Sequence, residues 1–261
     1  MTTFAGFNFA RCCLTRAQTS PMTKLNGCVL CVSKAATRGS NELGFMTEAR
    51  NELPLRCRCG HVRGIASEVT PHSGFRFICY CADCQAFAHL LDRPDVLDAA
   101  GGTDIFHMPT GRVRFVAGTD AVCCLQFSGK VFRWYAHCCR TPIGNTAGPR
   151  FPVVGLIHAF MNHDADGRSR DEVLGAPLCR IFERSAIGPL PPNAPAPASL
   201  GLFAGRGVKL LGWWLGGLGR PNPFFDHHTN APISEPRVIA PSERIALGHH
   251  PVAPIVRGIQ R

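Results

Sequence analysis

The chain has 261 residues, of which 45% are hydrophobic and 18% are charged. With a mean hydropathy of +0.03, this composition argues against a wholly disordered chain and against a protein with several membrane spans. Two excesses remain to be explained, a formal net charge of +10 and a total of 14 cysteines.

The basic charge lies mostly outside the cysteine-rich middle of the chain. Residues 46–184 carry 16 basic and 14 acidic residues, for a net charge of +2, together with ten cysteines. The two flanks carry the other +8. Because no basic run interleaved with aromatic residues occurs in the middle segment, we expect no specific binding of nucleic acid.

Residues 1–45 show neither helical nor strand periodicity. We expect a disordered extension or a start site assigned too early, although the basic, acid-poor composition also fits an organelle transit peptide. Cys28 and Cys31 form a C-x-x-C pair without a neighbouring partner pair. No secretory signal is apparent, so we expect a reducing, cytoplasmic location in which cysteines persist as thiols or metal ligands.

The middle segment, residues 46–184, has the alternation of β-strands. Apolar residues alternate with polar ones from Leu53 to Cys59 and again from Phe75 to Cys81. A short helix is expected from Asp83 or Cys84 to Leu91, with Asp83 as its N-cap. Further strand-like runs are 104–107, 112–116, 121–127, 131–135, 153–160 and 178–183, with a hairpin at 128–130. No βαβ rhythm is present, so the domain should be mainly β and mostly antiparallel.

Three cysteine clusters carry the candidate chemistry. They are Cys57-Arg-Cys59, Cys79-Tyr-Cys81-Ala-Asp-Cys84 and His137-Cys138-Cys139. In a strand, residues two apart point to the same face, so each C-x-C could present two thiolates to one ion. Cys84, at a helix N-terminus that favours its thiolate form, could supply a third. Such soft donors suit zinc.

Counting ligands predicts two different sites. Cys79, Cys81 and Cys84 supply three ligands, and a zinc with three protein ligands keeps a position for water or substrate. Cys57 and Cys59 supply only two ligands, so their partners are expected from the third cluster. Three other thiols, Cys123, Cys124 and Cys179, are expected to act as small buried hydrophobes.

The order and spacing of these clusters resemble those of the glutathione-dependent formaldehyde-activating enzyme family, which includes centromere protein V. The resemblance covers about residues 53–184 and implies an antiparallel zinc-binding β-tent with one or two zinc ions. It also implies a carbon–sulfur lyase activity that interconverts glutathione and formaldehyde with S-hydroxymethylglutathione or a related thiol–aldehyde adduct. On this resemblance Cys57 and Cys59 match the structural zinc pair, whereas Cys79, Cys81 and Cys84 match the catalytic zinc ligands.

The third cluster departs from the family pattern, which ends in C-G-T-P. Aligning Cys139 on that cysteine places Ala136 at the position of the first ligand and Arg140 at the position of the glycine. Cys138 could replace the missing ligand if the chain turns sharply, and His137 could do so because it shares a face with Cys139. We favour Cys138, since a four-thiolate site needs no change of ligand class.

The zinc in the open site could activate a glutathione-like thiol or polarise a carbonyl, and the sequence does not separate these roles. His61, His89 and His107 are candidates for proton transfer. The alternative function is a noncatalytic, zinc-stabilised binding module.

The C-terminal flank has a different composition. Residues 185–200 are rich in Pro and Ala and are expected to form a linker. Within residues 201–261, the run up to Leu218 is expected to form an amphipathic helix that packs on the β domain or on a partner, and a membrane-surface helix is the other interpretation. It is too interrupted to span a membrane. The remaining tail is expected to be irregular.

Overall fold

The computed structural model describes residues 51–127, 130–165 and 167–246, and the expectations for residues 1–45 lie outside these ranges. The described chain is mainly β, as the alternation predicts, and its strands form two sheets. The smaller sheet has the order β1 (Leu53–Arg56), β2 (Arg63–Ala66) and β5 (Val113–Ala117). The larger sheet has the order β10 (Cys179–Ile181), β3 (Phe75–Cys79), β4 (Thr103–Pro109), β9 (Val153–Ile157), β8 (Thr141–Thr146), β7 (Phe132–Ala136), β6 (Val122–Gln126) and β11 (Arg237–Val238).

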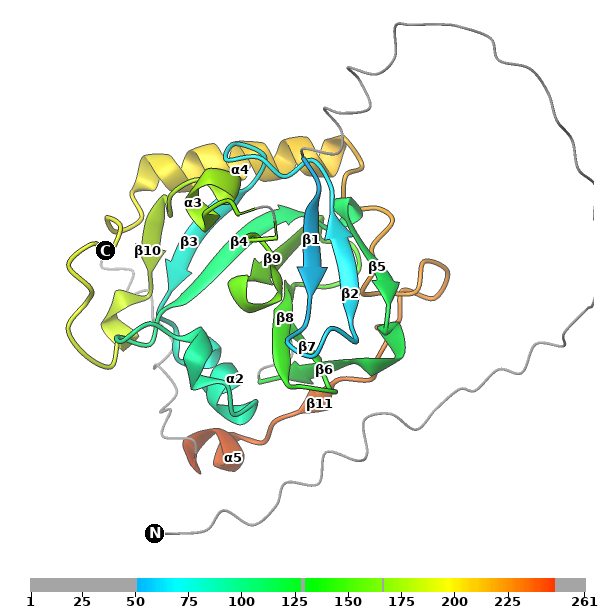
Figure 1. The fold of residues 1–261 in the computed structure, drawn as a ribbon, viewed down its shortest axis with the longest axis horizontal. Helices are drawn as coiled ribbons and strands as arrows, with labels where there is room; N and C mark the ends of the chain where they lie inside the picture. The colour runs from blue at the N-terminus through cyan, green and yellow to red at the C-terminus, as the bar shows by residue number, and fades with distance from the viewer. Residues whose placement is uncertain (1–50, 128–129, 166, 247–261) are drawn as a thin grey trace, which may run out of the picture.

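Four α-helices accompany the sheets in the described part of the chain, and α4 runs along one end of the molecule (Figure 1). They are α2 (Ala82–Leu90), α3 (Arg170–Leu174), α4 (Leu200–Leu215) and α5 (Pro241–Ala246). Short 3-10 turns are η2 (Pro94–Val96), η3 (Thr110–Arg112), η4 (Thr119–Ala121), η5 (His158–Phe160) and η6 (Glu183–Ser185). Within residues 51–246, gaps aside, no helix is both long and apolar enough to cross a membrane.

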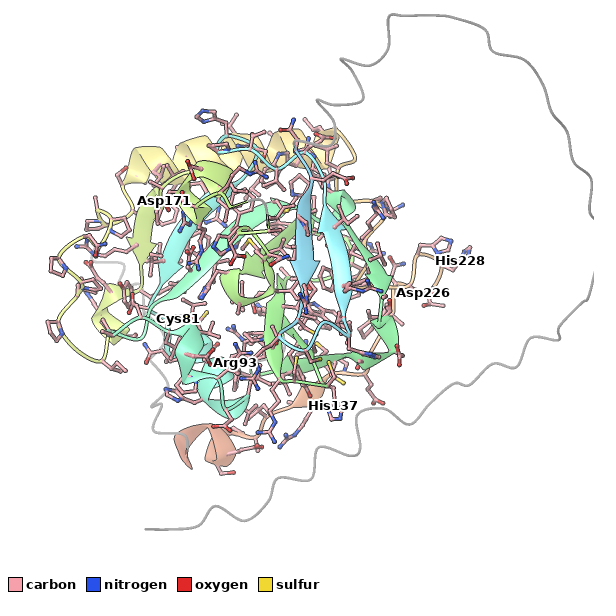
Figure 2. All side chains as sticks on the ribbon, in the orientation of Figure 1. Cys81, Arg93, His137, Asp171, Asp226 and His228 are labelled. Atoms are coloured by element: carbon pink, nitrogen blue, oxygen red, sulfur yellow. The ribbon has the colours of Figure 1, made fainter. Side chains whose placement is uncertain are left out.

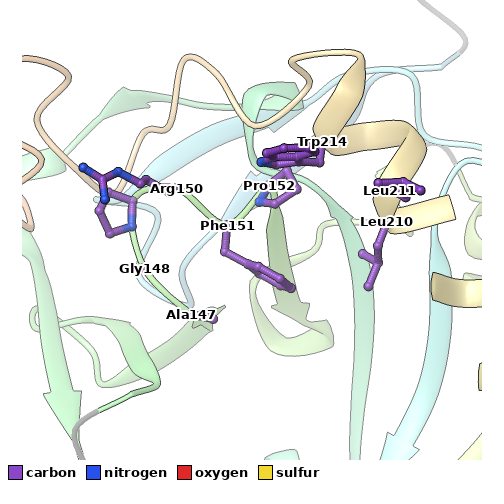
Figure 3. Close-up of a pocket in the computed structure, with 9 residues that line it drawn as sticks. Ala147, Gly148, Arg150, Phe151, Pro152, Leu210, Leu211 and Trp214 are labelled. Carbon is purple, nitrogen blue, oxygen red and sulfur yellow. The ribbon is translucent and has the colours of Figure 1, made fainter. Parts of the chain in front are cut away.

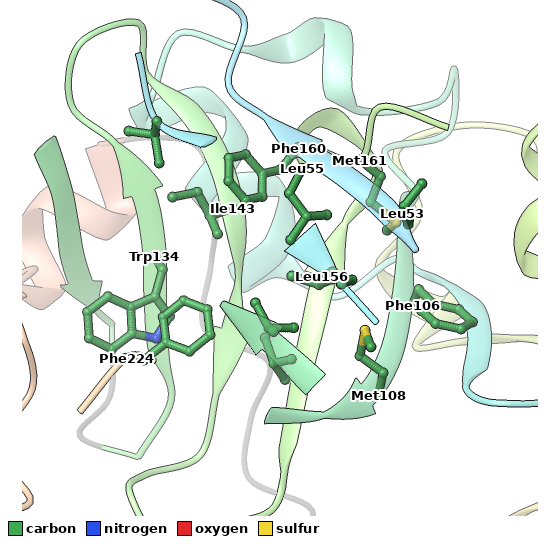
Figure 4. Packing of buried hydrophobic residues seen from close by; sticks show 14 of the residues in the cluster. Leu53, Leu55, Phe106, Met108, Trp134, Ile143, Leu156, Phe160, Met161 and Phe224 are labelled. Carbon is green, nitrogen blue, oxygen red and sulfur yellow. The ribbon is translucent and has the colours of Figure 1, made fainter. Parts of the chain in front are cut away.

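The larger sheet is covered on both faces, so successive residues of its strands enter different cores. Leu156 and Met108 pack against the smaller sheet, where Leu53 and Leu55 contribute to the same cluster (Figure 4). The neighbouring residue Ile157 lies in the second cluster, on the side of α2. Period-two alternation of the strands produces this division, because adjacent side chains point to opposite faces.

Strand pairing is mostly antiparallel, as predicted, but the two edges of the larger sheet are parallel pairs. β10 pairs with β3 and β11 pairs with β6 in parallel register. Each observed strand falls on a predicted run except β2, β8 and β11, which the sequence analysis missed. β2 and β8 contain Gly64 and Gly144, which both lie close to the backbone of a neighbouring strand. Glycine is needed at these positions because a side chain would not fit, but glycine is uncommon within strands, so neither strand was expected.

Two local expectations about the cysteines were wrong. β1 ends at Arg56, so Cys57 and Cys59 lie in a turn and not in a strand. Gly60 makes this turn with a φ of +79°, and its amide donates to the Cys57 carbonyl at 2.8 Å. The N-cap of α2 is Cys81 and not Asp83, which instead lies in the first helical turn.

The segment between α4 and β11 contributes to the first core although it contains no helix or strand. Phe224 and Phe225 are buried, and their rings lie 5.1 and 5.7 Å from that of Trp134. Figure 4 shows Phe224 beside Trp134. Aromatic residues dominate core energetics because each buries a large area. Part of the predicted irregular tail therefore helps to hold the β domain together.

Candidate metal centres

The first cysteine cluster joins the two sheets. Cys57 and Cys59 come directly after β1, whereas Cys138 and Cys139 lie in the connection from β7 to β8. The four sulfurs all lie within 4.8 Å of one another. The chain turns sharply enough to bring Cys138, and not His137, into this four-cysteine cluster.

The spacing of the sulfurs in the four-cysteine cluster matches a tetrahedral metal site. The sulfur of Cys138 lies 3.3 Å from that of Cys59 and 3.8 Å from that of Cys57, and the two latter sulfurs are 3.5 Å apart. A tetrahedral zinc with thiolates at about 2.3 Å has sulfur–sulfur edges of about 3.8 Å. The donor set and its spacing therefore fit a zinc ion.

Arg140 turns the chain back into β8 and has a φ of +57°. Glycine adopts this left-handed conformation without strain, whereas other residues pay a steric penalty there. The left-handed backbone therefore explains why the resemblance predicts a glycine at this position. In this chain Arg140 adopts the same conformation.

Thr141 is a site residue that the sequence analysis did not single out. Its Oγ1 accepts hydrogen bonds from the Arg58 amide at 3.0 Å and from Nη1 of Arg93 at 3.1 Å, and it lies 3.1 Å from the Cys139 sulfur. Arg93 follows α2, so this hydroxyl ties the end of the helix to the four-cysteine cluster. Arg58 and Arg93 lie far from Thr141 in the sequence, so no local pattern indicated that Thr141 contacts them.

The surroundings of Cys139 favour its thiolate. Burial alone would raise the pKa of this thiol, but hydrogen bonds from Thr141 and from neighbouring Cys59 and Cys57 lower the pKa to about 6. In contrast, burial raises the pKa of Cys138. Because metal ligation requires deprotonated thiols, binding at this cluster should release protons.

The second cluster lies where β3 meets α2, and Figure 2 marks its middle member, Cys81, at that junction. Cys79 is the last residue of β3, Cys81 is the N-cap of α2, and Cys84 lies in the first turn of that helix, as predicted. The Cys84 and Cys79 sulfurs are 3.7 Å apart, and all three sulfurs lie within 4.8 Å. This three-cysteine cluster could also hold a metal ion.

Burial differs among the three cysteines. Cys79 and Cys84 are buried, whereas Cys81 is only half-buried. The cluster therefore reaches solvent on the side of Cys81. Among the described residues, no further histidine, cysteine or carboxylate completes it as a fourth ligand.

A buried arginine accompanies the three-cysteine cluster. Arg133, in β7, has its Nη1 3.6 Å from the Cys84 sulfur and 3.3 Å from Oδ1 of Asn145. The guanidinium lies over the rings of Phe87 and Phe127, at 5.8 and 5.4 Å from their centroids. Hydrogen bonds from the other two cysteines and the charge of Arg133 hold the pKa of the Cys84 thiol well below its usual value, although burial opposes this.

Arg133 was not predicted as a site residue, because an arginine within a strand normally faces solvent. Here both faces of the sheet are covered, so the alternation places the arginine in the second core beside Cys84. An arginine within an otherwise apolar strand was the only available signal.

The histidines considered for proton transfer lie elsewhere. His61 and His89 are exposed, and neither belongs to a cysteine cluster. His107 is held by Arg206 and packs edge-on against Phe77 at 4.7 Å between ring centroids. His137, labelled in Figure 2, remains beside the four-cysteine cluster and lines a cleft of about 410 Å³.

Fold and sites together define a mainly β protein with two cysteine clusters that could each hold a metal ion. A model of the family of unknown function DUF6151 matches residues 50–235, so the chain belongs to that family. The match continues beyond the β domain through α4 and the Phe224-Phe225 segment. No curated protein matches the chain significantly.

Proposed function

We propose that this chain is a zinc protein of the β-tent type and that it acts on thiol–aldehyde adducts as a carbon–sulfur lyase. The observation that carries the proposal is the pairing of two unlike clusters, one with four cysteines and one with three. A closed four-thiolate site is typical of structural zinc, whereas three protein ligands leave a position open. The order and spacing of the clusters support the same reaction class.

The reaction is an addition and its reverse. The sulfur of a small thiol such as glutathione bonds to the carbonyl carbon of formaldehyde, and the thiol proton ends on the former carbonyl oxygen. Cleavage returns thiol and aldehyde, so no oxidant or reductant is needed. Zinc bound to Cys79, Cys81 and Cys84 would supply a Lewis acid that lowers the pKa of a bound thiol or polarises a carbonyl.

The surrounding residues have separate roles in this proposal. The half-buried side at Cys81 admits the small substrate, while the burial of Cys79 and Cys84 excludes water from the opposite side. Arg133 places a positive charge beside Cys84, which offsets the excess negative charge of three thiolates on a divalent ion. Asn145 positions that guanidinium through its amide oxygen.

The four-cysteine cluster would be a structural zinc site that links the two sheets. It connects the turn after β1 in the smaller sheet to the β7–β8 connection in the larger one. Zinc binding there stabilises the folded state because the unfolded chain has no preformed site.

Metal analysis of the purified chain is the first test. We expect about two equivalents of zinc, falling to about one in Cys81→Ser and in Cys138→Ser. Cys179→Ala is the matched control, since Cys179 is buried in β10 but belongs to neither cluster. A zinc content near zero in the unmodified protein would refute both the structural and the catalytic site.

Exchange NMR with glutathione and formaldehyde then tests the enzyme. We expect the zinc-loaded protein to accelerate exchange between formaldehyde and S-hydroxymethylglutathione, and Cys81→Ser to lose the acceleration while Cys179→Ala keeps it. Exchange at the spontaneous rate by protein with full zinc content would instead favour the noncatalytic zinc-stabilised binding module.

A further inference from the structure

Helix α4 attaches to the β domain through the side that carries its two cations and the buried Trp213. The Arg206 guanidinium contacts Nδ1 of His107, and the Lys209 ammonium donates to the backbone carbonyls of His72 and Gly74. Burial lowers the pKa of both cations, as expected for charges turned toward protein and not toward water. The side of α4 that carries Arg206 and Lys209 therefore packs against the β domain.

The apolar side of α4 faces outward. Its large residues each expose between 51% and 86% of their surface, namely Leu200, Phe203, Val208, Leu211, Trp214 and Leu215. These positions recur at helical spacing on the side opposite Arg206 and Lys209. A surface helix of a globular protein normally has the reverse orientation. α4 does pack on the β domain, through Arg206, Lys209 and the buried Trp213, but most of its large apolar residues lie on the other side of the helix.

A groove extends the apolar face of α4 toward the β8–β9 loop. It has a volume of about 620 Å³ and is lined by Leu210, Leu211, Trp214 and loop residues including Phe151 and Pro152 (Figure 3). Monomeric proteins rarely expose apolar patches beyond about 300–600 Å². Six half-exposed large side chains along a 16-residue helix, plus this groove, mark an interaction surface.

The segments that form this surface carry charges of one sign, although the exposed Asp226 follows them directly. Residues 199–225 and the loop 147–152 contain basic residues but no Asp or Glu. Arg150 and Arg220 are exposed, and the chain beside Arg220 packs on the loop, since a Cβ at Gly219 would lie 2.9 Å from Pro152. Two copies of the chain meeting through this surface would bring like charges together, whereas an anionic surface would be attracted.

We propose that the outward face of α4 and the loop 147–152 dock on an anionic phospholipid bilayer. The helix lies in the plane of the headgroups with Trp214, Leu211 and Leu215 inserted, and Arg150 and Arg220 contact lipid phosphates. Interfacial helices combine such an apolar face with flanking basic residues and aromatic anchors. Docking here is independent of the cysteine clusters and of the activity proposed for them.

Vesicle binding of the zinc-loaded full-length chain tests this surface. We expect co-sedimentation with phosphatidylcholine vesicles that contain phosphatidylserine, weaker binding without phosphatidylserine, and a further decrease at high salt. Emission of Trp214 should shift to the blue on binding, since Trp134 and Trp213 are already buried. The shift should be lost in Trp214→Phe.

A double variant separates this surface from the basic N-terminal residues, which could also attract vesicles. Leu211→Glu with Leu215→Glu alters only exposed positions and should lower vesicle affinity by about tenfold or more while leaving thermal unfolding and zinc content unchanged. The matched control is Ile187→Glu, which changes a residue of similar exposure away from α4. Equal vesicle binding by the double variant and the control would overturn the proposal. So would a concentration-dependent dimer, abolished by the double variant, in a protein that does not bind vesicles.

Discussion

Replacing Arg133 by methionine tests whether a buried positive charge stabilises the proposed zinc in the three-cysteine cluster. Methionine fills the space between Phe87 and Phe127 without the charge. At the 3.6 Å separation from the Cys84 sulfur, Coulomb attraction with an effective dielectric constant of about 20 amounts to about 5 kcal/mol. Relaxation and water entry reduce this upper bound, and lost partners of metal ligands typically lower metal affinity by about 10- to 100-fold.

We therefore expect Arg133→Met to weaken zinc binding at the three-cysteine cluster by about 10- to 100-fold. Arg133→Lys keeps the charge and should retain most of the affinity. Stepwise competition with a chromophoric zinc chelator measures both, and the step that disappears in Cys81→Ser identifies the cluster. Asp83, the other charged partner at 3.6 Å, is partly exposed and can be hydrated when the arginine is removed. Unchanged zinc affinity in a folded Arg133→Met protein would refute the electrostatic reasoning.

Three further predictions concern stability. Arg140→Gly should stabilise the fold by about 1 kcal/mol, because glycine adopts the left-handed φ of +57° without strain. Phe224→Ala should destabilise it by about 3–5 kcal/mol, since the ring is fully buried against Trp134. Burial and the charge of Arg170 lower the pKa of His158 to about 4. Because the unfolded pKa is about 6.5, stability should be fully present above pH 6.5 and fall toward pH 4, by up to about 1.4 kcal/mol per pH unit.

Urea unfolding measures all three effects. Arg114→Gly, at an exposed position of β5, is the control for Arg140→Gly and should destabilise instead. If Arg140→Gly destabilised the protein as much as Arg114→Gly does, the strain argument would be wrong. If Phe224→Ala were as stable as the parent protein, the segment that contains Phe224 would not contribute to the core. His158→Gln should flatten the pH dependence between pH 6.5 and 4, and an unaltered slope would assign that dependence to other groups.

The strands were predictable to the extent that their alternation is local. Runs such as 121–127 and 131–135 produced β6 and β7 because period-two patterning needs no distant information. β2 and β8 escaped because glycines interrupt them, and those glycines are required by the close approach of neighbouring strands. The parallel edge pairs were equally inaccessible, since pairing of β10 with β3 joins segments about a hundred residues apart.

The membership of each cysteine cluster was anticipated, but the local geometry was not. Strand alternation predicts that Cys57 and Cys59 face one ion, yet a turn at Gly60 brings them together. Likewise Cys81 meets Cys79 from a helix N-cap. Short spacing along the chain predicts that two thiols can reach the same metal ion. It does not predict the backbone conformation, because a strand, a turn or a helix N-terminus can each bring such thiols together.

The sequence by itself determined which segments alternate, which cysteines lie close along the chain, and that α4 has one charged and one apolar side. Tertiary structure decided which sides face inward. Arg133 lies beside Cys84 only because both faces of the larger sheet are covered. The apolar side of α4 faces outward because the partners of its cations, His107 and the carbonyls of His72 and Gly74, come from segments about a hundred residues or more away. A periodic pattern defines two faces, but only the elements packed against them determine which face is buried.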